Sequence, residues 1–150
     1  MMIKDVQCKP LTVLADDRGC FMEVVREDDP FFSRFGQSNF TLTYPGVVKA
    51  WHWHREQDDL WFVTCGMAQV GLHDLREDSP TRGQTDVFYL GEHNRALLFI
   101  PSGVAHGYRV LGTTPLGLVY YTTHRYNPHD ELRRPWNDPT IGFDWTTVNR

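Results

Sequence analysis

The sequence predicts an all-β protein, and three observations support this expectation. Short runs rich in β-branched and aromatic residues alternate with glycine- and proline-containing turns along most of the chain. Several runs, such as residues 69–73, place apolar residues at every second position, which is the period of a strand with one buried face. No segment has the extended 3.6-residue period of a long amphipathic helix. We therefore expect a β-sandwich or β-barrel.

The expected strands follow one another at short intervals. They are residues 47–53, 60–65, 68–72, 87–90, 96–100, 108–111 and 116–122. Residues 27–34 form the best candidate for a short helix, which Pro30 limits to a helix start or a loop. The polar segment 127–150 contains three prolines, and we expect it to cover the barrel surface without regular structure.

The size and charge of the chain limit its function. Its 150 residues fit one domain, 1–150, that can bury a core. The net charge of −4 and the lack of a Lys/Arg-rich run disfavour nucleic acid and anionic membranes as partners. Cys8, Cys20 and Cys65 are odd in number and lack a CxxC spacing, which is typical of reduced thiols. With neither a signal peptide nor an apolar run of membrane-spanning length, we expect a cytoplasmic protein.

The densest group of chemically active side chains is a histidine pair. Residues two apart on a strand share a face, so His52 and His54 project together, opposite to Trp51 and Trp53. A third histidine, His106, follows a predicted strand. Three interpretations stay open: a divalent transition-metal site, an acid–base catalyst, or imidazoles that are only hydrogen-bonded in a polar interior. The remaining histidines are expected at the surface or in turns: His73, His93, His124 and His129.

The spacing around these histidines resembles the two motifs of the cupins. The residues that match are Gly46, His52, His54, Asp59 and Gly66 for the first motif, and Pro101, Gly103 and His106 for the second. Asp59 stands where cupins usually carry glutamate. The resemblance implies a cupin fold, a double-stranded β-helix or jelly-roll barrel. In a metal-binding cupin the ligands would be His52, His54, Asp59 and His106, a set that suits zinc, iron, manganese or nickel.

A closer resemblance covers residues 17 to about 145. Segments that match the sugar-nucleotide 3,5-epimerases in order and spacing are DRGCFME (17–23), FGQSN (35–39), GVVKAWH (46–52), DLREDSPTRG (74–83), IPSGVAHGY (100–108), YYTTHRY (120–126) and WNDP (136–139). The chain is thus similar to the dTDP-4-dehydrorhamnose 3,5-epimerase family of RmlC-like cupins.

This resemblance implies epimerisation of a dTDP-4-keto-6-deoxy sugar at C3, C5 or both, without a cofactor. A base removes a proton beside the ketone, and an acid returns one on the opposite face of the ring. By matching position, the base is His52 and the acid is Tyr120. The substrate contacts fall on Arg18, Phe21, Glu23, Gln37, Asn39, Lys49, His54, His106 and Tyr126. The family also implies a homodimer, because some nucleotide contacts come from across its interface.

The chain departs from the family pattern at the reacting end of the site. His54 replaces a glutamine, and Asp59 stands where the family has a lysine. The family also continues past the end of this sequence with a segment that carries the carboxylate partner of the catalytic histidine, for which Asp59 or Asp74 is a candidate replacement. Two alternatives therefore stay open: a metal-dependent cupin isomerase or dioxygenase with a divalent transition metal, and a non-catalytic sugar-nucleotide-binding cupin.

Overall fold

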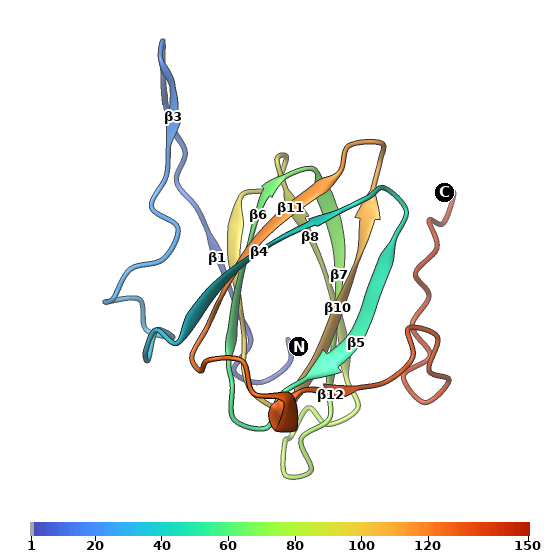
Figure 1. Ribbon diagram of the computed structural model, residues 1–150. Helices are drawn as coiled ribbons and strands as arrows, with labels where there is room; N and C mark the ends of the chain where they lie inside the picture. The colour runs from blue at the N-terminus through green and yellow to red at the C-terminus, as the bar shows by residue number, and fades with distance from the viewer. Residues whose placement is uncertain (1) are drawn as a thin grey trace.

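The computed structural model describes residues 2–150, and its regular secondary structure is almost entirely antiparallel β-strand (Figure 1). Its elements are β1 (Gln7–Pro10), β2 (Leu14–Asp16), β3 (Gly19–Phe21), β4 (Gln37–Thr43), β5 (Val48–Trp53), β6 (Asp59–Cys65), β7 (Met67–Asp74), β8 (Thr85–Gly91), β9 (Ala96–Ile100), β10 (Val104–Leu111), β11 (Leu116–Thr122), the 3-10 turn Pro128–Asp130 and β12 (Leu132–Arg133). Every strand expected from the sequence is present, which confirms the predicted all-β class.

Two five-stranded sheets face each other and form the barrel. One has the strand order β1-β9-β6-β11-β4, and the other has the order β12-β5-β10-β7-β8. The remaining two strands, β2 and β3, pair only with each other. Figure 1 shows this hairpin projecting away from the barrel. The fold is therefore a double-sheet barrel that carries one separate arm.

The apolar core fills the barrel between the two sheets. Its central residues include Val70 and Leu72 on β7 and Leu98 on β9, all of them fully buried. Each such side chain contributes about 1.5–3 kcal/mol relative to an exposed one. Trp61 belongs to this cluster, and its ring also packs edge-on against His106 with centroids 5.2 Å apart. Trp61 therefore lies at the boundary between the apolar core and the polar histidine group.

The C-terminal segment covers the outer face of β5 and β10. Trp51 points outward from β5 and packs against Phe143 and Trp145, with ring centroids 5.6 and 5.1 Å away. Trp51 is almost fully buried by this contact. The expectation that residues 127–150 cover the barrel surface is confirmed, except that Pro128–Asp130 and Leu132–Arg133 have regular structure.

Residues 27–34 form a loop with turns, which is one of the two forms expected for this segment. The Asp29 carboxylate accepts hydrogen bonds from the Arg26 backbone N–H and from Lys9 Nζ, both at 2.8 Å. Such local bonds to an aspartate favour turns over a helix.

One expectation was wrong. His73 is buried instead of exposed, since it lies on β7 beside Thr85 of β8, and the two side chains are hydrogen-bonded at 2.7 Å.

The close approach of β5 and β10 depends on Gly107. A Cβ atom at this position would lie only 2.2 Å from the Cβ of Ala50, so no larger residue fits without moving a strand. The β5–β10 pairing also shifts register between His106 and Tyr108, which is the signature of a bulge. Because of this pairing, His106 lies directly opposite His52.

Asp74 organises the 74–83 loop. Its carboxylate is fully buried and accepts hydrogen bonds from Arg76 Nε at 2.9 Å, Ser79 Oγ at 2.6 Å and Thr81 Oγ1 at 2.7 Å. Burial acts to raise the pKa of Asp74, but the bonds from Arg76, Ser79 and Thr81 outweigh it and hold the pKa well below its usual range. Ser79 and Thr81 of the SPT segment therefore act as hydrogen-bond donors to this carboxylate.

We expect Asp74→Asn to lower the free energy of unfolding by about 3 kcal/mol at pH 7, because it leaves Arg76 without its buried counterion. Urea unfolding measures this, with the exposed loop variant Asp78→Asn as a control that changes stability by less than about 0.5 kcal/mol. Because the pKa of Asp74 is lower in the folded state than its unfolded value of about 4, the ionised carboxylate stabilises the fold above pH 4. This stabilisation is lost as the pH falls below 4 through the folded-state pKa. The difference between wild type and Asp74→Asn should therefore shrink as the pH falls below 4. Equal stabilities at pH 7 would contradict this account.

Candidate active site

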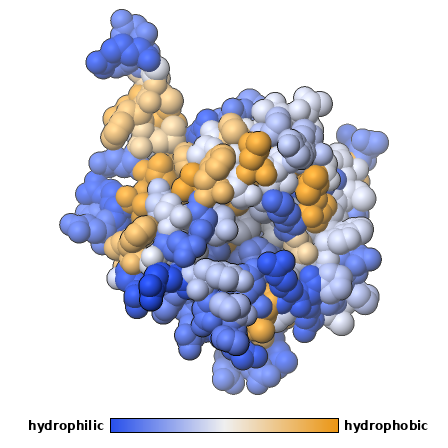
Figure 2. Space-filling model, viewed as in Figure 1, coloured by the Kyte–Doolittle hydropathy of each residue, from blue (hydrophilic) through white to orange (hydrophobic). Residues whose placement is uncertain are grey.

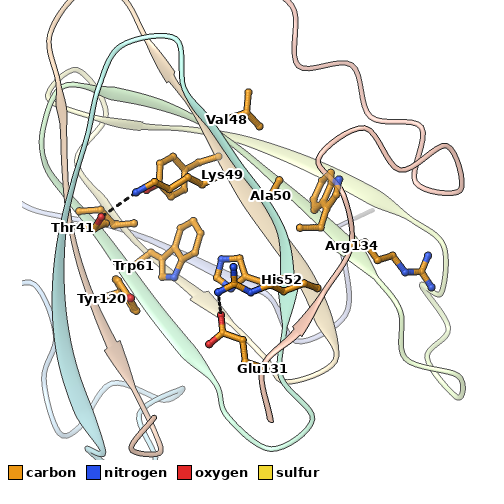
Figure 3. A pocket seen from close by; sticks show the side chains of 13 residues that line it. Thr41, Val48, Lys49, Ala50, His52, Trp61, Tyr120, Glu131 and Arg134 are labelled. Carbon is orange, nitrogen blue, oxygen red and sulfur yellow. Dashed lines mark hydrogen bonds and ion pairs between the residues drawn. The ribbon is translucent and has the colours of Figure 1, made fainter. Parts of the chain in front are cut away.

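A polar hollow lies between the two sheets (Figure 3). It consists of two adjoining cavities of about 440 and 470 Å³. Four residues line both: His52, Tyr120, Glu131 and Arg133. Its size suits a small organic ligand.

His52 enters this hollow from β5. Its ring lies 4.3 Å from that of His106 and stacks beside Trp61 at 6.4 Å, measured between centroids. Its Nδ1 is buried and has no hydrogen-bond partner among residues 2–150. Burial and the neighbouring His106 lower the pKa of His52 to about 3, although the charges of Asp59 and Glu131 act in the opposite direction. The imidazole is therefore neutral at pH 7 and can accept a proton.

Tyr120 enters the same hollow from the facing sheet. It lies on β11, between Asn39 of β4 and Trp61 of β6 in the strand pairing. Burial raises its pKa, and the negative charges of Asp59 and Glu131 add to the effect. The phenol is therefore protonated at neutral pH and can donate a proton. Figure 3 shows Tyr120 and His52 projecting from opposite walls.

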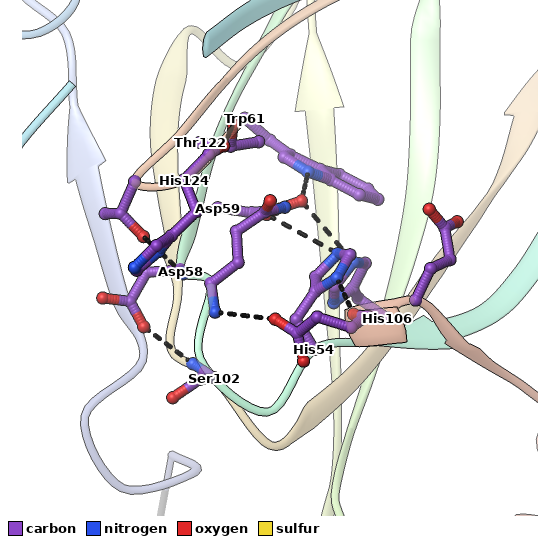
Figure 4. A network of polar contacts seen from close by, with 12 residues as sticks. His54, Asp58, Asp59, Trp61, Ser102, His106, Thr122 and His124 are labelled. Atoms are coloured by element: carbon purple, nitrogen blue, oxygen red, sulfur yellow. Dashed lines mark hydrogen bonds and ion pairs between the residues drawn. The ribbon is translucent and has the colours of Figure 1, made fainter. Parts of the chain in front are cut away.

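A second polar group surrounds Asp59 (Figure 4). Asp59 is 1% exposed, and its carboxylate oxygens lie 3.9 Å from His54 Nε2 and 3.6 Å from His106 Nε2. The same oxygens accept hydrogen bonds from Gln57 Nε2 at 2.7 Å and Trp61 Nε1 at 3.1 Å. Asp59 thus lies between His54 and His106 on one side and its hydrogen-bond donors Gln57 and Trp61 on the other.

The backbone holds two of the histidine rings in place. The Nδ1 atom of His54 donates to the carbonyl of Asp130 at 2.7 Å, and that of His106 donates to the carbonyl of Val104 at 3.0 Å. Because a carbonyl oxygen can only accept, each of these two Nδ1 atoms carries a proton. Burial and the neighbouring His54 lower the pKa of His106 to about 3, which keeps that ring neutral.

Asp130 fixes the loop that follows the histidine pair. Its side chain accepts from the backbone N–H groups of Arg55 at 2.6 Å, Glu56 at 3.2 Å and Gln57 at 3.3 Å. Its carbonyl holds His54, so one buried residue of the C-terminal segment positions both the loop and the ring.

The other residues expected to contact substrate divide into two groups. Gln37, Asn39 and Tyr126 line the cavity that contains His52 and Tyr120, and Lys49 lines the adjoining one. The arm places the remaining residues outside both cavities: Arg18, Phe21 and Glu23. Arg18 is exposed and pairs with Asp16, while Glu23 pairs with Arg26 at 3.0 Å.

Asp59 and Asp74, the two candidates for a carboxylate partner of His52, lie in different environments. Asp74 is occupied by Arg76 and the 74–83 loop. Asp59 contacts His54 and His106. Glu131 lines both cavities together with His52. Sequence reasoning missed Glu131 because it lies in a segment expected to lack regular structure, whereas β12 pairs with β5 and carries it to the site.

Comparisons with known proteins agree with this architecture. The sequence model of the dTDP-4-dehydrorhamnose 3,5-epimerase family matches residues 1–150. The chain is 58% identical to the spore coat polysaccharide biosynthesis protein SpsL of Bacillus subtilis, over 99% of this chain and 100% of that protein. It is 43% identical to the probable low-salt glycan biosynthesis epimerase Agl13 of Haloferax volcanii, over 95% of this chain and 94% of that protein.

Solved structures show the same cupin fold. A dTDP sugar isomerase from Desulfovibrio desulfuricans G20 superposes with a TM-score of 0.91 at 32% identity, covering 98% of this chain and 94% of that one. The dTDP-6-deoxy-D-glucose-3,5-epimerase RmlC of Legionella pneumophila, in complex with dTDP-4-keto-L-rhamnose, superposes with a TM-score of 0.88 at 28% identity, covering 100% and 83%. Among residues 2–150, no helix is long and apolar enough to cross a membrane.

Proposed function

The chain belongs to the dTDP-4-dehydrorhamnose 3,5-epimerase family, and we propose that it epimerises a dTDP-linked 4-keto-6-deoxy sugar at C3, C5 or both, with His52 as the base and Tyr120 as the acid. One observation carries the assignment of roles. A neutral imidazole and a protonated phenol face one hollow from opposite sheets. Epimerisation needs a proton acceptor and a proton donor on opposite faces of the sugar ring.

The reaction follows from the acidity of a C–H bond beside a ketone. His52 takes the proton from that carbon. The electron pair of the C–H bond then forms a double bond to C4, which gives an enolate with its charge on the C4 oxygen. Tyr120 then donates its phenolic proton to the carbon from the other face, which restores the ketone and inverts the centre. Solvent returns a proton to Tyr120 and removes one from His52. Because the substrate ketone accepts the electron pair, the reaction needs no cofactor.

The remaining side chains of the hollow suit the rest of a sugar nucleotide. Gln37 and Asn39 project inward from β4 and offer amide groups for sugar hydroxyls. Lys49 and Arg133 provide positive charge for a diphosphate at the open side. The free thiols of all three cysteines fit the reducing cytoplasm, where sugar nucleotides would be available.

Solvent-deuterium exchange tests the two catalytic roles. With dTDP-4-keto-6-deoxyglucose in D₂O, we expect wild type to incorporate deuterium with inversion. His52→Ala should lower the exchange rate about 10²–10⁴-fold, because it removes the base. Tyr120→Phe should still exchange a proton but lose the inverted product. The control is Tyr121→Phe, whose ring points away from the hollow into a separate apolar cluster.

Unchanged exchange in His52→Ala would contradict the assignment of the base. Loss of exchange in the Tyr121→Phe control would mean that the effects are structural. If wild type exchanges no proton with any nucleotide-linked keto sugar, the proposed reaction itself fails, and thermal stabilisation by dTDP alone would then indicate a binding protein.

We further propose that Glu131 supports the charge that forms on His52. Its carboxylate lines the hollow beside His52, is mostly buried, and is fixed by Arg133 Nη2 at 2.7 Å. A carboxylate in this place stabilises the imidazolium that exists after proton abstraction, since attraction between charges is strong where water is excluded. Glu131 is therefore a positioning residue and not a group that exchanges a proton with substrate.

We expect Glu131→Gln to lower kcat about 10- to 100-fold while KM changes less than about threefold, because the charge matters mainly after proton transfer. Glu131→Asp should recover part of kcat. Steady-state kinetics measure both values, and the exposed variant Glu92→Gln serves as the charge-matched control. A raised KM with an unchanged kcat would assign Glu131 to ground-state binding and overturn this role.

We also propose a homodimer formed through β4 and the β2–β3 arm. The pattern of β4 is inverted relative to an isolated barrel: polar Gln37, Asn39 and Thr41 face inward, while Phe40 and Leu42 are 65% and 53% exposed. β4 is also the last strand of its sheet, so its outer edge has no partner strand among residues 2–150. Figure 2 shows an apolar region that extends from the arm onto the barrel. A dimer would cover this surface and bring the arm residues to the partner's hollow.

Phe40→Asp should convert the dimer to a monomer. It replaces a side chain whose burial contributes about 1.5–3 kcal/mol on each subunit, so dimerisation weakens about 100-fold or more. Sedimentation equilibrium measures the change. The control is Tyr89→Asp, which changes another exposed aromatic, on the opposite sheet, at 50% exposure. A monomeric wild type, or a dimer that survives Phe40→Asp, would contradict the assigned interface.

A further inference from the structure

His52 lacks the backbone hydrogen bond that fixes the two other rings of the histidine cluster. Its Nδ1 is buried and has no hydrogen-bond partner among residues 2–150, whereas Nδ1 of His54 and Nδ1 of His106 each donate to a backbone carbonyl. The ring of His52 contacts the rings of Trp61 and His106, but such contacts are less directional than a hydrogen bond. The orientation of the proposed base therefore depends on how firmly β5 is held.

Trp51, the residue before His52, is fixed on the outer face of the same strand. It is 1% exposed, and its ring lies 5.1 Å from that of Trp145 and 5.6 Å from that of Phe143, measured between centroids. The rings of Phe143 and Trp145 are in turn 4.3 Å apart. Gly71 of β7 lies directly beneath this group, since a Cβ atom there would come within 2.9 Å of the Trp51 ring and 3.0 Å of the Trp145 ring. The aromatic rings are therefore pressed against the sheet, which limits movement of Trp51.

The C-terminal segment that carries Trp145 is tied to the barrel at several points. Trp145 Nε1 donates to the carbonyl of Trp136 at 3.1 Å, and Arg109 of β10 donates to the carbonyl of Trp145. The same segment also pairs with the backbone of β5. The N–H of Trp51 donates to the carbonyl of Arg134, and the N–H of Arg134 donates to the carbonyl of Trp51, both at 3.0 Å. Trp51 is thus held at its backbone from the strand edge and at its ring from the outer face.

Successive residues of a strand point to opposite faces, so a displacement of Trp51 on the outside moves His52 on the inside. From these contacts we infer that Trp145 is a positioning residue, which acts through Trp51 and β5 to orient the His52 ring toward the substrate. This inference rests on the proposed role of His52 as the base. Trp145 lines neither cavity of the hollow, so its effect on the reaction is indirect.

The orientation of the His52 ring can be measured without the reaction, by NMR of intact protein with isotope-labelled histidine. We expect Trp145→Ala to shift or broaden the ring resonances of His52. Those of His54 and His106 should change less, because backbone carbonyls hold these rings. Trp145→Phe retains an aromatic ring against Trp51 and should keep the wild-type resonances of His52.

Steady-state kinetics measure the consequence for the reaction. Trp145→Ala should lower kcat about 10- to 100-fold with KM changed less than about threefold, because a base misplaced by about 1 Å loses rate while the substrate contacts remain. Trp145→Phe should recover most of kcat. The matched control is Phe31→Ala, which removes a buried ring from a separate apolar cluster, where Phe31 stacks on Phe99 at 5.5 Å. This control should lower stability but leave the His52 resonances and kcat unchanged.

Unchanged His52 resonances or an unchanged kcat in folded Trp145→Ala would overturn the inference, and so would equal changes in Trp145→Ala and Phe31→Ala. If circular dichroism shows that Trp145→Ala does not fold, Trp145→Leu fills more of the space and decides by the same measurements. A wild type that exchanges no proton with a keto sugar would refute the proposed function, whereas the NMR result would still report whether Trp145 orients His52. The two failures are therefore distinguishable.

Discussion

The pairing of β5 with β10 is the constraint on which the rest of the site depends. Gly107 allows the two strands to approach so closely that its missing Cβ would collide with Ala50. The pairing places His52 opposite His106 and directs their rings into the barrel. On the other side of the same strand it turns Trp51 outward, where Phe143 and Trp145 cover it. One strand thus supplies polar chemistry to the interior and an apolar anchor for the C-terminal segment.

A polar interior is costly, and the molecule offsets this cost with backbone groups more than with opposite charges. His54 and His106 are satisfied by the carbonyls of Asp130 and Val104, and Asp59 by Gln57 and Trp61. Five buried side-chain atoms have no hydrogen-bond partner among residues 2–150, and two of them, His52 Nδ1 and His106 Nε2, lie inside the histidine cluster. Buried polar atoms without partners are uncommon in folded proteins and mark places where a ligand, ion or proton belongs. The two in the histidine cluster lie beside the hollow to which we assign the proposed reaction.

The outer surface shows the opposite arrangement, because apolar side chains are exposed there. β4 directs amides and hydroxyls inward and exposes Phe40 and Leu42, while the arm carries Phe21 and Arg18 away from its own hollow. A single chain gains nothing from this arrangement, because exposed apolar side chains contribute no burial energy. In the dimer that we propose, a second copy would cover the strand.

The sequence by itself determined the fold class and the shared face of the histidine pair, because the period of two along a strand groups residues by face without knowledge of the fold. It also gave the family, through motifs spread along nearly the whole chain. It did not reveal β4, whose polar and apolar residues alternate in the sense opposite to a one-chain barrel, or the role of the C-terminal segment, where no local pattern marks Asp130 and Glu131. Only the tertiary structure decided that Asp74 belongs to a loop and Asp59 to the histidines, and that His106 faces His52. These outcomes depend on strand register and on contacts between residues far apart in the chain, which the local pattern of a sequence does not encode.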